Sequence, residues 1–277
     1  NVIYRESTID ISDNSRSSIT YTVPLTGGEA KTIEKYNDLV SDASISPDGK
    51  YQLTSEEVKL KKVSGVDHYK DMNISNVQIY DNLNYRHWDT WEDGAFGHVF
   101  VSALDGSSKI DLMENERYDC PQMPFGGSED YIWGPEGKTV LYVSKKSEGA
   151  AYAVSTNSDI YEYTIATKKT TNLTPTNKGY DTQPAFSAKG TLAWTSMKRD
   201  GYESDKNDII VRIDGKHVNL TAAWDGTVNG FTWGEDGEKI YFTAPVLGTV
   251  QLFEITVPKT ATSKITASKQ ITNGQFD

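Results

Sequence analysis

The sequence predicts an all-β fold, a β-propeller built from four-stranded antiparallel blades. Three observations predict it: a glycine turn that recurs between short apolar strands, a second turn in every unit, and a closing segment of similar sequence after it. The turn glycines at positions 137, 190 and 237 are 53 and 47 residues apart, close to the length of one propeller blade. Two hairpin turns and a closing strand make the four-stranded sheet that propellers repeat around an axis.

The first turn of each unit has the composition of a hairpin turn. Its glycine supplies the positive φ that tight hairpins need, and Pro or Asp favours the preceding turn positions. A β-rich run follows each time. The first turns lie at residues 45–50, 133–138, 186–191 and 233–239, and the runs after them at 51–53, 140–143, 192–194 and 240–242.

The second turns and the closing strands complete the units. The second turns lie at 104–107, 166–169, 213–216 and 258–260, and the closing strands at 110–112, 172–174, 219–221 and 270–272. We therefore expect a single propeller region over residues 1–277 with about five blades. These are a partial blade at 1–40 and blades at 41–113, 128–174, 181–222 and 229–273.

The unit at 41–113 is longer than the others. Gly49 and Gly137 are 88 residues apart, enough for two blades, and Asp93-Gly94 lies near the midpoint. Only one closing strand, at 109–112, occurs in this stretch, so we interpret residues 58–97 as an excursion inside one blade. A division into two blades is the alternative.

Both ends of the chain resemble the inside of the repeat. Residues 1–5 match 139–143, the strand that follows a first turn, and residues 272–277 match 176–181, which lead into the next blade. A closed ring seals its strand edges, whereas unpaired edges promote aggregation. We therefore expect the chain to be a piece of a longer propeller.

Charge, cysteine and motif content exclude several functions. A formal charge of −11, from 39 acidic and 28 basic residues, disfavours nucleic acid and anionic membranes as partners. No apolar stretch is long enough to predict a membrane span. The single Cys120 and the four scattered histidines predict no metal site, and we expect no cofactor. Because the chain has no Gly-x-Ser-x-Gly motif, we expect no catalytic residues in it.

Two segments carry more chemistry than a blade needs, and the first is residues 85–94. It holds two Trp, a His, an Arg and three carboxylates. Aromatic side chains and arginine dominate binding hot spots, so a contact patch is predicted. The alternative is a strand pair that packs both tryptophans into the excursion, with Arg86 and Asp89 as an ion pair. The predicted patch consists of Arg86, His87, Trp88 and Trp91.

The second segment is residues 194–208, which form a loop too long for a simple hairpin. Glu203 and Asp205 are candidates to hold a cationic group, such as the amino terminus of a peptide, by charge-assisted hydrogen bonds. The alternative is a solvated loop whose own lysines and arginine pair with neighbouring acids.

Several of these segments together resemble the propeller of the prolyl oligopeptidase family, in the bacterial branch of dipeptidyl-peptidase 5 and acylaminoacyl-peptidase. They are residues 85–91, the loop 196–208, and Ala223-Trp224-Asp225-Gly226 before Phe231-Thr232-Trp233. The likeness covers most of the chain. The Pro-Asp-Gly-Lys turns are less specific evidence for the family, because TolB-like propellers share them. The turn at 186–190 departs from this pattern, since it lacks both Pro and Asp.

The resemblance implies a seven- or eight-bladed propeller that caps an α/β-hydrolase domain, with the Ser, Asp and His of that domain outside this chain. It implies a periplasmic or secreted peptidase whose propeller narrows access to peptides and holds their free amino terminus. The implied partners are the peptide substrate and the hydrolase domain of the same protein, and whether this chain alone is an enzyme stays open. The expected substrate-binding residues are Glu203, which holds the amino terminus, with Tyr202, Trp194, Arg199 and Asp205.

Two other functions stay open. A TolB-like binding module would recruit a protein partner through Trp88 and Trp91 and would hydrolyse nothing. A propeller glycosidase would need paired carboxylates at the propeller axis, which the sequence does not place.

Overall fold

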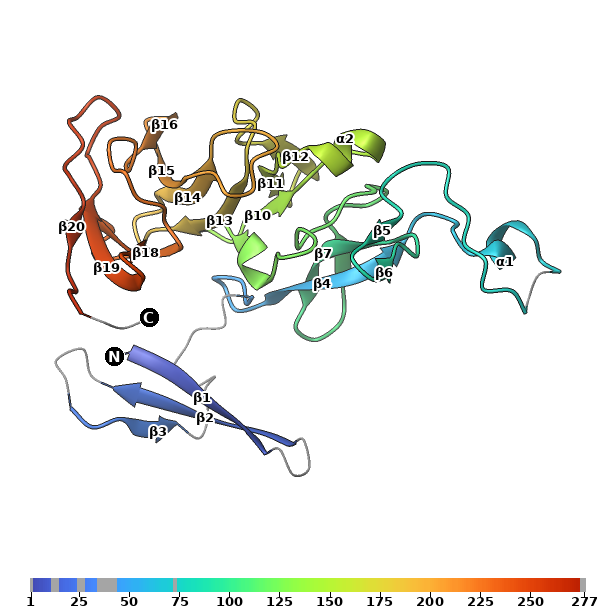
Figure 1. Ribbon diagram of the computed structural model, residues 1–277, viewed down its shortest axis with the longest axis horizontal. Helices are drawn as coiled ribbons and strands as arrows, with labels where there is room; N and C mark the ends of the chain where they lie inside the picture. Colours follow the sequence, from blue (N-terminus) through green and yellow to red (C-terminus); the bar gives the residue numbers. More distant parts are fainter. Residues whose placement is uncertain (1, 11–14, 24–27, 34–43, 72–73, 275–277) are drawn as a thin grey trace. The chain divides into compact units, whose positions relative to one another are not determined.

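The computed structural model describes residues 2–10, 15–23, 28–33, 44–71 and 74–274, in two compact units (Figure 1). The first unit, Asn1–Ala43, holds an antiparallel sheet of three strands in the order β1-β2-β3. These strands are β1 (Val2–Asp10), β2 (Ser15–Val23) and β3 (Lys31–Ile33). The match of the two chain ends to the inside of the repeat rests partly on Asn1 and residues 275–277. These residues lie outside the described part of the chain.

The second unit, Ser44–Asp277, holds four larger antiparallel sheets in its described residues. Three of them have four strands, each strand pairing with the next in the chain, and one has three. The all-β class and the four-stranded sheets are confirmed, while the number of blades stays a prediction. The sheets are β4 (Tyr51–Lys59), β7 (Ala95–Ala103) and β8 (Lys109–Asp111); β9 (Tyr131–Trp133), β10 (Thr139–Ser144), β11 (Asp159–Thr164) and β12 (Lys169–Asn172); β13 (Asp181–Phe186), β14 (Leu192–Met197), β15 (Asn207–Ile213) and β16 (Lys216–Asn219); and β17 (Gly230–Trp233), β18 (Lys239–Val246), β19 (Thr249–Thr256) and β20 (Lys269–Gln270).

The glycine of every predicted first turn has the left-handed backbone that the turn requires. Its φ is +70° at Gly49, +66° at Gly137, +80° at Gly190 and +64° at Gly237. Each of these glycines donates its N–H to the carbonyl three residues earlier, at 2.8 or 2.9 Å. The four hairpin turns are therefore confirmed, and the residue type follows from the sign of φ.

Consecutive sheets contact one another next to these turns. A β-carbon on Gly137 would lie 3.3 Å from Cδ of Pro47, in the turn of the preceding sheet. The indole N–H of Trp133 donates to the carbonyl of Ser44 at 2.8 Å, and Trp233 makes the corresponding bond to the sheet before it at 3.1 Å. The sheets of the second unit follow one another in chain order, as Figure 1 shows from blue-green to red.

Apolar side chains fill the spaces between these sheets. Three buried clusters each join side chains from two consecutive sheets. Trp194, Tyr142 and Phe242 are the largest fully buried side chains in the described part of the chain. This burial of apolar surface supplies the main favourable contribution to folding.

Three of the four predicted closing segments, all except 110–112, share one hydrogen-bond role. Thr174 accepts a hydrogen bond from the N–H of Ile160 at 3.0 Å and donates one to Asp159 at 3.1 Å. Thr221 and Thr272 make the corresponding bonds one and two sheets later. The closing segments therefore resemble one another because each threonine satisfies a strand amide where the sheet ends.

Replacing Thr174 by valine is expected to lower the free energy of unfolding by about 1–3 kcal/mol, because the buried N–H of Ile160 loses its acceptor. Urea unfolding measures the change. Thr171→Val, at an exposed position of β12, is the matched control and should cost less than about 0.5 kcal/mol. Equal losses in both variants would contradict the role of the Thr174 hydroxyl.

The chain leaves its sheet after β4 and returns at β7. These two strands pair with each other along their whole length, so residues 60–94 are inserted between neighbouring strands. The described residues of the insertion contain no further four-stranded sheet. We call residues 60–94 the excursion. It contains the short helix α1 (Gly65–His68) and a hairpin of β5 (Arg86–His87) and β6 (Thr90–Trp91).

Connections between antiparallel strands alternate between the two ends of a sheet. The glycine turns therefore lie at one end of the second unit. Three segments leave from the opposite end: the excursion, the segment 145–158 with α2 (Gly149–Val154), and the loop 198–206. The sheet-to-sheet connection 112–130 lies there too. We call this end the loop end, and it carries both segments that the sequence analysis singled out.

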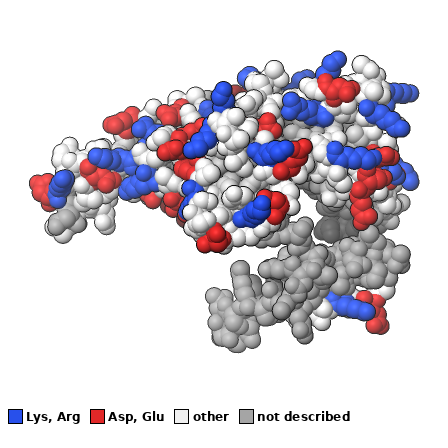
Figure 2. Space-filling view, turned by 180° about the vertical axis from the view of Figure 1, so that it is seen from behind, with Lys and Arg blue, Asp and Glu red and all other residues white. Residues whose placement is uncertain are grey.

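Charged side chains of both signs are interspersed over the face of the second unit that Figure 2 shows. Among the described residues, no helix is long and apolar enough to cross a membrane.

Candidate functional site

The predicted contact patch lies on the hairpin of the excursion. Arg86 pairs with Trp91 across the two strands, and its guanidinium lies 5.7 Å from the centre of the Trp91 ring. The rings of Tyr80 and Tyr85 stack on Trp91 with centres 6.1 and 6.0 Å away. Trp91 is therefore covered on part of its surface by its own neighbours in the excursion, and it stays 49% exposed.

Trp88 differs from Trp91 because it faces out of the hairpin. It is 68% exposed, and its ring centre lies 5.7 Å from that of Phe125, which is 79% exposed. The ring of His87 packs against Trp88 at 4.8 Å. Within the described residues, Arg86 and Asp89 form no ion pair. Trp88 thus connects the excursion to the connection 112–130.

Arg199 and Asp205 bind each other in the long loop. The guanidinium of Arg199 donates two hydrogen bonds to the Asp205 carboxylate, at 3.0 and 2.8 Å. It also lies 4.0 Å from the centre of the Tyr202 ring. Hydrogen bonding from Arg199 lowers the pKa of Asp205. The Arg199–Asp205 ion pair therefore joins the two sides of the loop 198–206. The alternative of a solvated loop, whose basic side chains pair with neighbouring acids, expects this for Arg199.

Trp194 lies in the core and not in the loop. It is 2% exposed on β14, and its indole N–H donates to Asp181 at 2.9 Å. His217 packs edge-on against its ring at 4.8 Å. Trp194 therefore presents no surface to a ligand in this structure, and we do not keep it among the substrate contacts.

Glu203 lines a cavity of about 290 Å³ at the loop end, which we call the Glu203 pocket. Its carboxylate forms no hydrogen bond or ion pair with any described residue, unlike that of Asp205. The charge of Glu203 contributes to raising the pKa of Tyr180, after the larger effect of burial. Other residues that line the pocket are Gln122, Phe125, Glu129, Asp130, Tyr180 and Met197.

The wall opposite Glu203 comes from the connection 112–130. Asp130 is buried, which raises the pKa of its carboxyl to about 6, and it accepts a hydrogen bond from the N–H of Gln122 at 2.9 Å. The side-chain oxygen of Gln122 is buried and has no hydrogen-bond partner. Glu129 is exposed at the same pocket. The wall therefore offers hydrogen-bond acceptors that the protein itself does not use.

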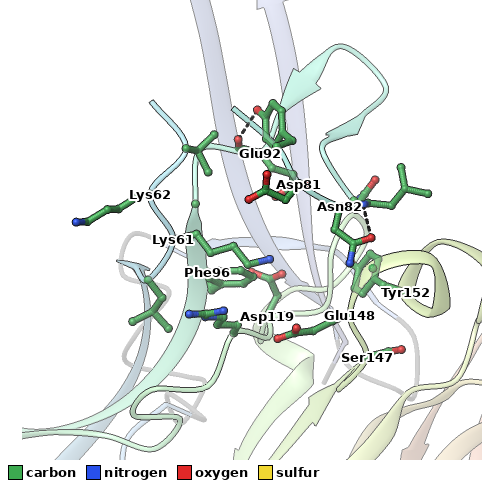
Figure 3. A pocket seen from close by; sticks show the side chains of 18 of the residues that line it. Lys61, Lys62, Asp81, Asn82, Glu92, Phe96, Asp119, Ser147, Glu148 and Tyr152 are labelled. Carbon is green, nitrogen blue, oxygen red and sulfur yellow. Dashed lines mark hydrogen bonds between the residues drawn. The ribbon is translucent and has the colours of Figure 1, made fainter. Parts of the chain in front are cut away.

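A larger cavity, of about 610 Å³, lies between the excursion and the segments 117–119 and 147–152 (Figure 3). We call it the excursion pocket. Burial raises the pKa of Asp119 to about 6 and also raises the pKa of Glu92. Burial further raises the pKa of Tyr152 to about 12. In Figure 3 the side chain of Glu92 comes from the excursion, and those of Asp119 and Tyr152 come from the facing segments.

The two pockets share one lining segment. The connection 112–130 lines both of them, with Asp119 at the excursion pocket and Gln122 at the Glu203 pocket. The ammonium group of Lys145 lies 4.2 Å from the centre of the Tyr152 ring. Burial lowers the pKa of Lys145, and the charges of Asp200 and Glu203 partly oppose this shift. Lys145 is therefore close to both cavities.

Metal binding has no support in the described part of the chain. No group of three or more His, Cys, Asp or Glu side chains there has the geometry to hold an ion. Asp119, Gln122 and Lys145 could not be predicted from the sequence, because no motif marks them. The one available signal was the length of the connection 112–130, which far exceeds the usual two to six residues or so between elements.

Comparison with known proteins identifies relatives of the chain. It is 40% identical over 238 residues to dipeptidyl-peptidase 5 of Porphyromonas gingivalis, covering 84% of this chain and 34% of that protein. It is 37% identical over 238 residues to dipeptidyl-peptidase 5 of Porphyromonas endodontalis, covering 84% of this chain and 33% of that protein. The chain thus spans about a third of the length of these curated relatives. No protein-family model matches it.

Among solved structures, the chain is similar in fold to an acylaminoacyl peptidase of Pyrococcus horikoshii. The TM-score is 0.60 with 13% sequence identity, over 98% of this chain and 44% of that chain. At this identity the likeness concerns the fold alone.

These relatives, with the repeated four-stranded sheets, show that the chain is β-propeller sequence of the prolyl oligopeptidase family of serine peptidases. Within that family it is a homologue of dipeptidyl-peptidase 5. The resemblance inferred from residues 85–91 and 196–208 is therefore confirmed.

Proposed function

We propose that the chain is the part of a dipeptidyl-peptidase 5-type exopeptidase that admits peptides and holds their free amino terminus in the Glu203 pocket. Cleavage of the peptide bond is assigned to an α/β-hydrolase domain of the same protein, outside this chain. The observation that carries the proposal is the set of unused hydrogen-bond acceptors in this pocket.

An ammonium group carries three N–H donors and no acceptor. The carboxylates of Glu203 and Glu129 have no ion-pair partner among the described residues, and the buried oxygen of Gln122 has no hydrogen-bond partner. Hydrogen bonds between an ammonium group and a carboxylate are shorter and stronger than neutral ones. The pocket therefore suits a peptide's amino terminus.

We assign the restriction of peptide access to the aromatic rings beside the Glu203 pocket. Phe125 lines the pocket, and Trp88 packs against it from the excursion at 5.7 Å between ring centres. Both rings are largely exposed, so they border the approach to Glu203. We further propose that the protein works in the periplasm or outside the cell, which fractionation of the producing cells tests.

Replacing Glu203 by glutamine in the full-length protein is expected to lower kcat/KM for substrates with a free amino terminus by about 10- to 100-fold. This is the loss of one hydrogen bond to a charged group, about 1.5–3 kcal/mol. Substrates with an acetylated amino terminus should change less than about twofold, because they make no such bond. Initial rates on matched free and acetylated peptides measure the difference.

Ser204→Ala, at an exposed position of the same loop, is the control variant and should leave both substrates unaffected. An equal effect of Glu203→Gln on both substrate types would contradict the proposed role.

A second candidate, a TolB-like module that binds a partner and hydrolyses nothing, is favoured by the exposed pair Trp88 and Phe125. Exposed aromatic side chains that meet in a cluster are typical of protein contact sites. A full-length protein that hydrolyses neither peptide, but still binds a partner through Trp88, would support this candidate instead.

A further inference from the structure

The excursion pocket contains two carboxylates that the fold withdraws from water. Asp119 is half-buried and accepts a hydrogen bond from the N–H of Gly97 at 2.8 Å. The carboxylate of Glu92, also half-buried, has no hydrogen-bond or ion-pair partner among the described residues. The charge of Glu92 helps to raise the pKa of Asp119, so the two groups lie close enough to repel each other.

The basic side chains of the lining neutralise these two acids only in part, because the charge of the half-buried Lys61 lowers the pKa of Glu92 against the larger effect of burial. The ammonium group of Lys61 lies 5.4 Å from the centre of the Phe96 ring, and Lys62 and Arg117 are exposed. In the described part of the chain, none of the three forms an ion pair with Glu92 or Asp119. Charges in water interact weakly, whereas charges withdrawn from water interact strongly. The lining therefore sets two carboxylates that are withdrawn from water against one half-buried ammonium group, and this excess of negative charge favours a further cation in the cavity.

The remainder of the lining is partly apolar. Leu60, Val63, Ile79 and Phe96 line the same cavity. A lysine or arginine side chain has an apolar stem of three or four methylene groups and a charged head, and it binds best where apolar walls lead to an acidic group. The volume of about 610 Å³ has room for such a side chain and for the backbone that carries it.

A metal ion is a poorer occupant. The described residues contain no group of three or more acidic, His or Cys side chains in metal-binding geometry, and the cavity is far larger than a bare ion. An anion would have to approach Glu92 and Asp119, which oppose it. An organic cation satisfies both carboxylates at once.

We propose that the excursion pocket binds the cationic side chain of a lysine or arginine in a bound peptide, with its head group between Glu92 and Asp119. The proposal rests on the proposed function, because the peptide is the one whose amino terminus occupies the Glu203 pocket. The connection 112–130 and Lys145 lie beside both pockets, so one peptide reaches both.

Two small probes separate the two pockets in the full-length protein. Alanine amide has a free α-amine and no basic side chain, and N-acetyl-lysine amide has a basic side chain and a blocked α-amine. Binding of each is measured by isothermal titration calorimetry. We expect Glu92→Gln and Asp119→Asn each to weaken the binding of N-acetyl-lysine amide at least about tenfold and to change the binding of alanine amide by less than about twofold. Glu203→Gln should weaken the binding of alanine amide at least about tenfold and change the binding of N-acetyl-lysine amide by less than about twofold.

Two controls keep the test specific. Asp81→Asn, at an exposed acid of the same cavity, should change the binding of neither probe by more than about twofold, because the proposal places the cationic head group between Glu92 and Asp119 and not at Asp81. N-acetyl-norleucine amide, which has an apolar side chain and no charge, should bind the parent protein at least about tenfold more weakly than N-acetyl-lysine amide. Thermal unfolding of each variant checks that it is folded.

The outcomes separate the two proposals. If N-acetyl-lysine amide binds equally to the parent protein and to both carboxylate variants, or no better than the norleucine probe, the inference is overturned while the Glu203 pocket is unaffected. If Glu203→Gln binds alanine amide as tightly as the parent protein does, while the lysine probe responds as expected, the proposed function fails instead.

Discussion

Replacing Lys146 by alanine is expected to destabilise the second unit by about 3 kcal/mol. Its side chain is 15% exposed and donates hydrogen bonds to the carboxylate of Glu116 and to the hydroxyl of Tyr142, the latter at 2.9 Å. The ammonium group also lies 4.2 Å from the centre of the Tyr161 ring. Without it, Glu116 and Tyr142 lose their partner in a site that water reaches poorly, which costs more than the loss of an exposed pair.

The consequence of this substitution extends to the candidate site. Glu116 belongs to the connection 112–130, whereas Lys146 follows β10, so the ion pair holds the connection against the sheet of β9 to β12. The same connection lines both pockets. Weakening its attachment should therefore also weaken binding of both probes described above, by a similar factor for each.

Urea unfolding measures the loss of stability. Lys138→Ala is the control, because the ion pair of Lys138 with Glu136 is exposed on both sides and should contribute less than about 0.5 kcal/mol. Lys146→Met retains an unbranched apolar stem beside the tyrosines and should recover part of the loss. If Lys146→Ala were as stable as Lys138→Ala, the ion pair would not hold the connection.

The fold was predictable where the structure depends on local chemistry. The four turn glycines have a positive φ: Gly49, Gly137, Gly190 and Gly237. Glycine tolerates this backbone conformation, so each turn can be recognised from its own local sequence. The closing segments were recognised as similar before their role was known. The hydrogen bonds of Thr174 and its counterparts now give the reason for that similarity.

The candidate site was predictable only in part, because its residues meet through the arrangement of the sheets. Glu203 was found from the length and charge of its loop, and the structure adds that it faces a cavity. Trp194 was grouped with it by sequence proximity, but it lies on a strand whose side chains alternate between faces, and its ring points into the core. Asp119 and Gln122 come from a connection about eighty residues earlier in the sequence, and no local pattern links them to Glu203.

The wall of the Glu203 pocket should make stability depend on pH through Asp130. Burial raises the pKa of this carboxyl from the ordinary 3.8 to about 6, against the opposing effect of the Gln122 N–H. The folded state therefore binds the proton more tightly than the unfolded state does. This contribution to stability is fully present below about pH 4 and is lost as the pH rises through about 6.

Asp130→Asn has no proton to lose and keeps an oxygen that accepts the hydrogen bond from Gln122. Relative to this variant, the parent protein is expected to lose up to about 3 kcal/mol of stability between pH 4 and pH 7, since one pKa unit corresponds to about 1.4 kcal/mol. Comparing the two proteins at each pH by urea unfolding cancels the titration of all other groups. Asp105→Asn is the control, because hydrogen bonding to Ser107 lowers the pKa of Asp105 below 3.8, so the stability that the parent protein gains over that variant is complete above about pH 4 and should stay nearly constant from pH 4 to pH 7. A difference between parent and Asp130→Asn that stayed constant from pH 4 to pH 7 would mean that Asp130 ionises as freely in the folded protein as in the unfolded chain, and that water reaches this wall of the pocket.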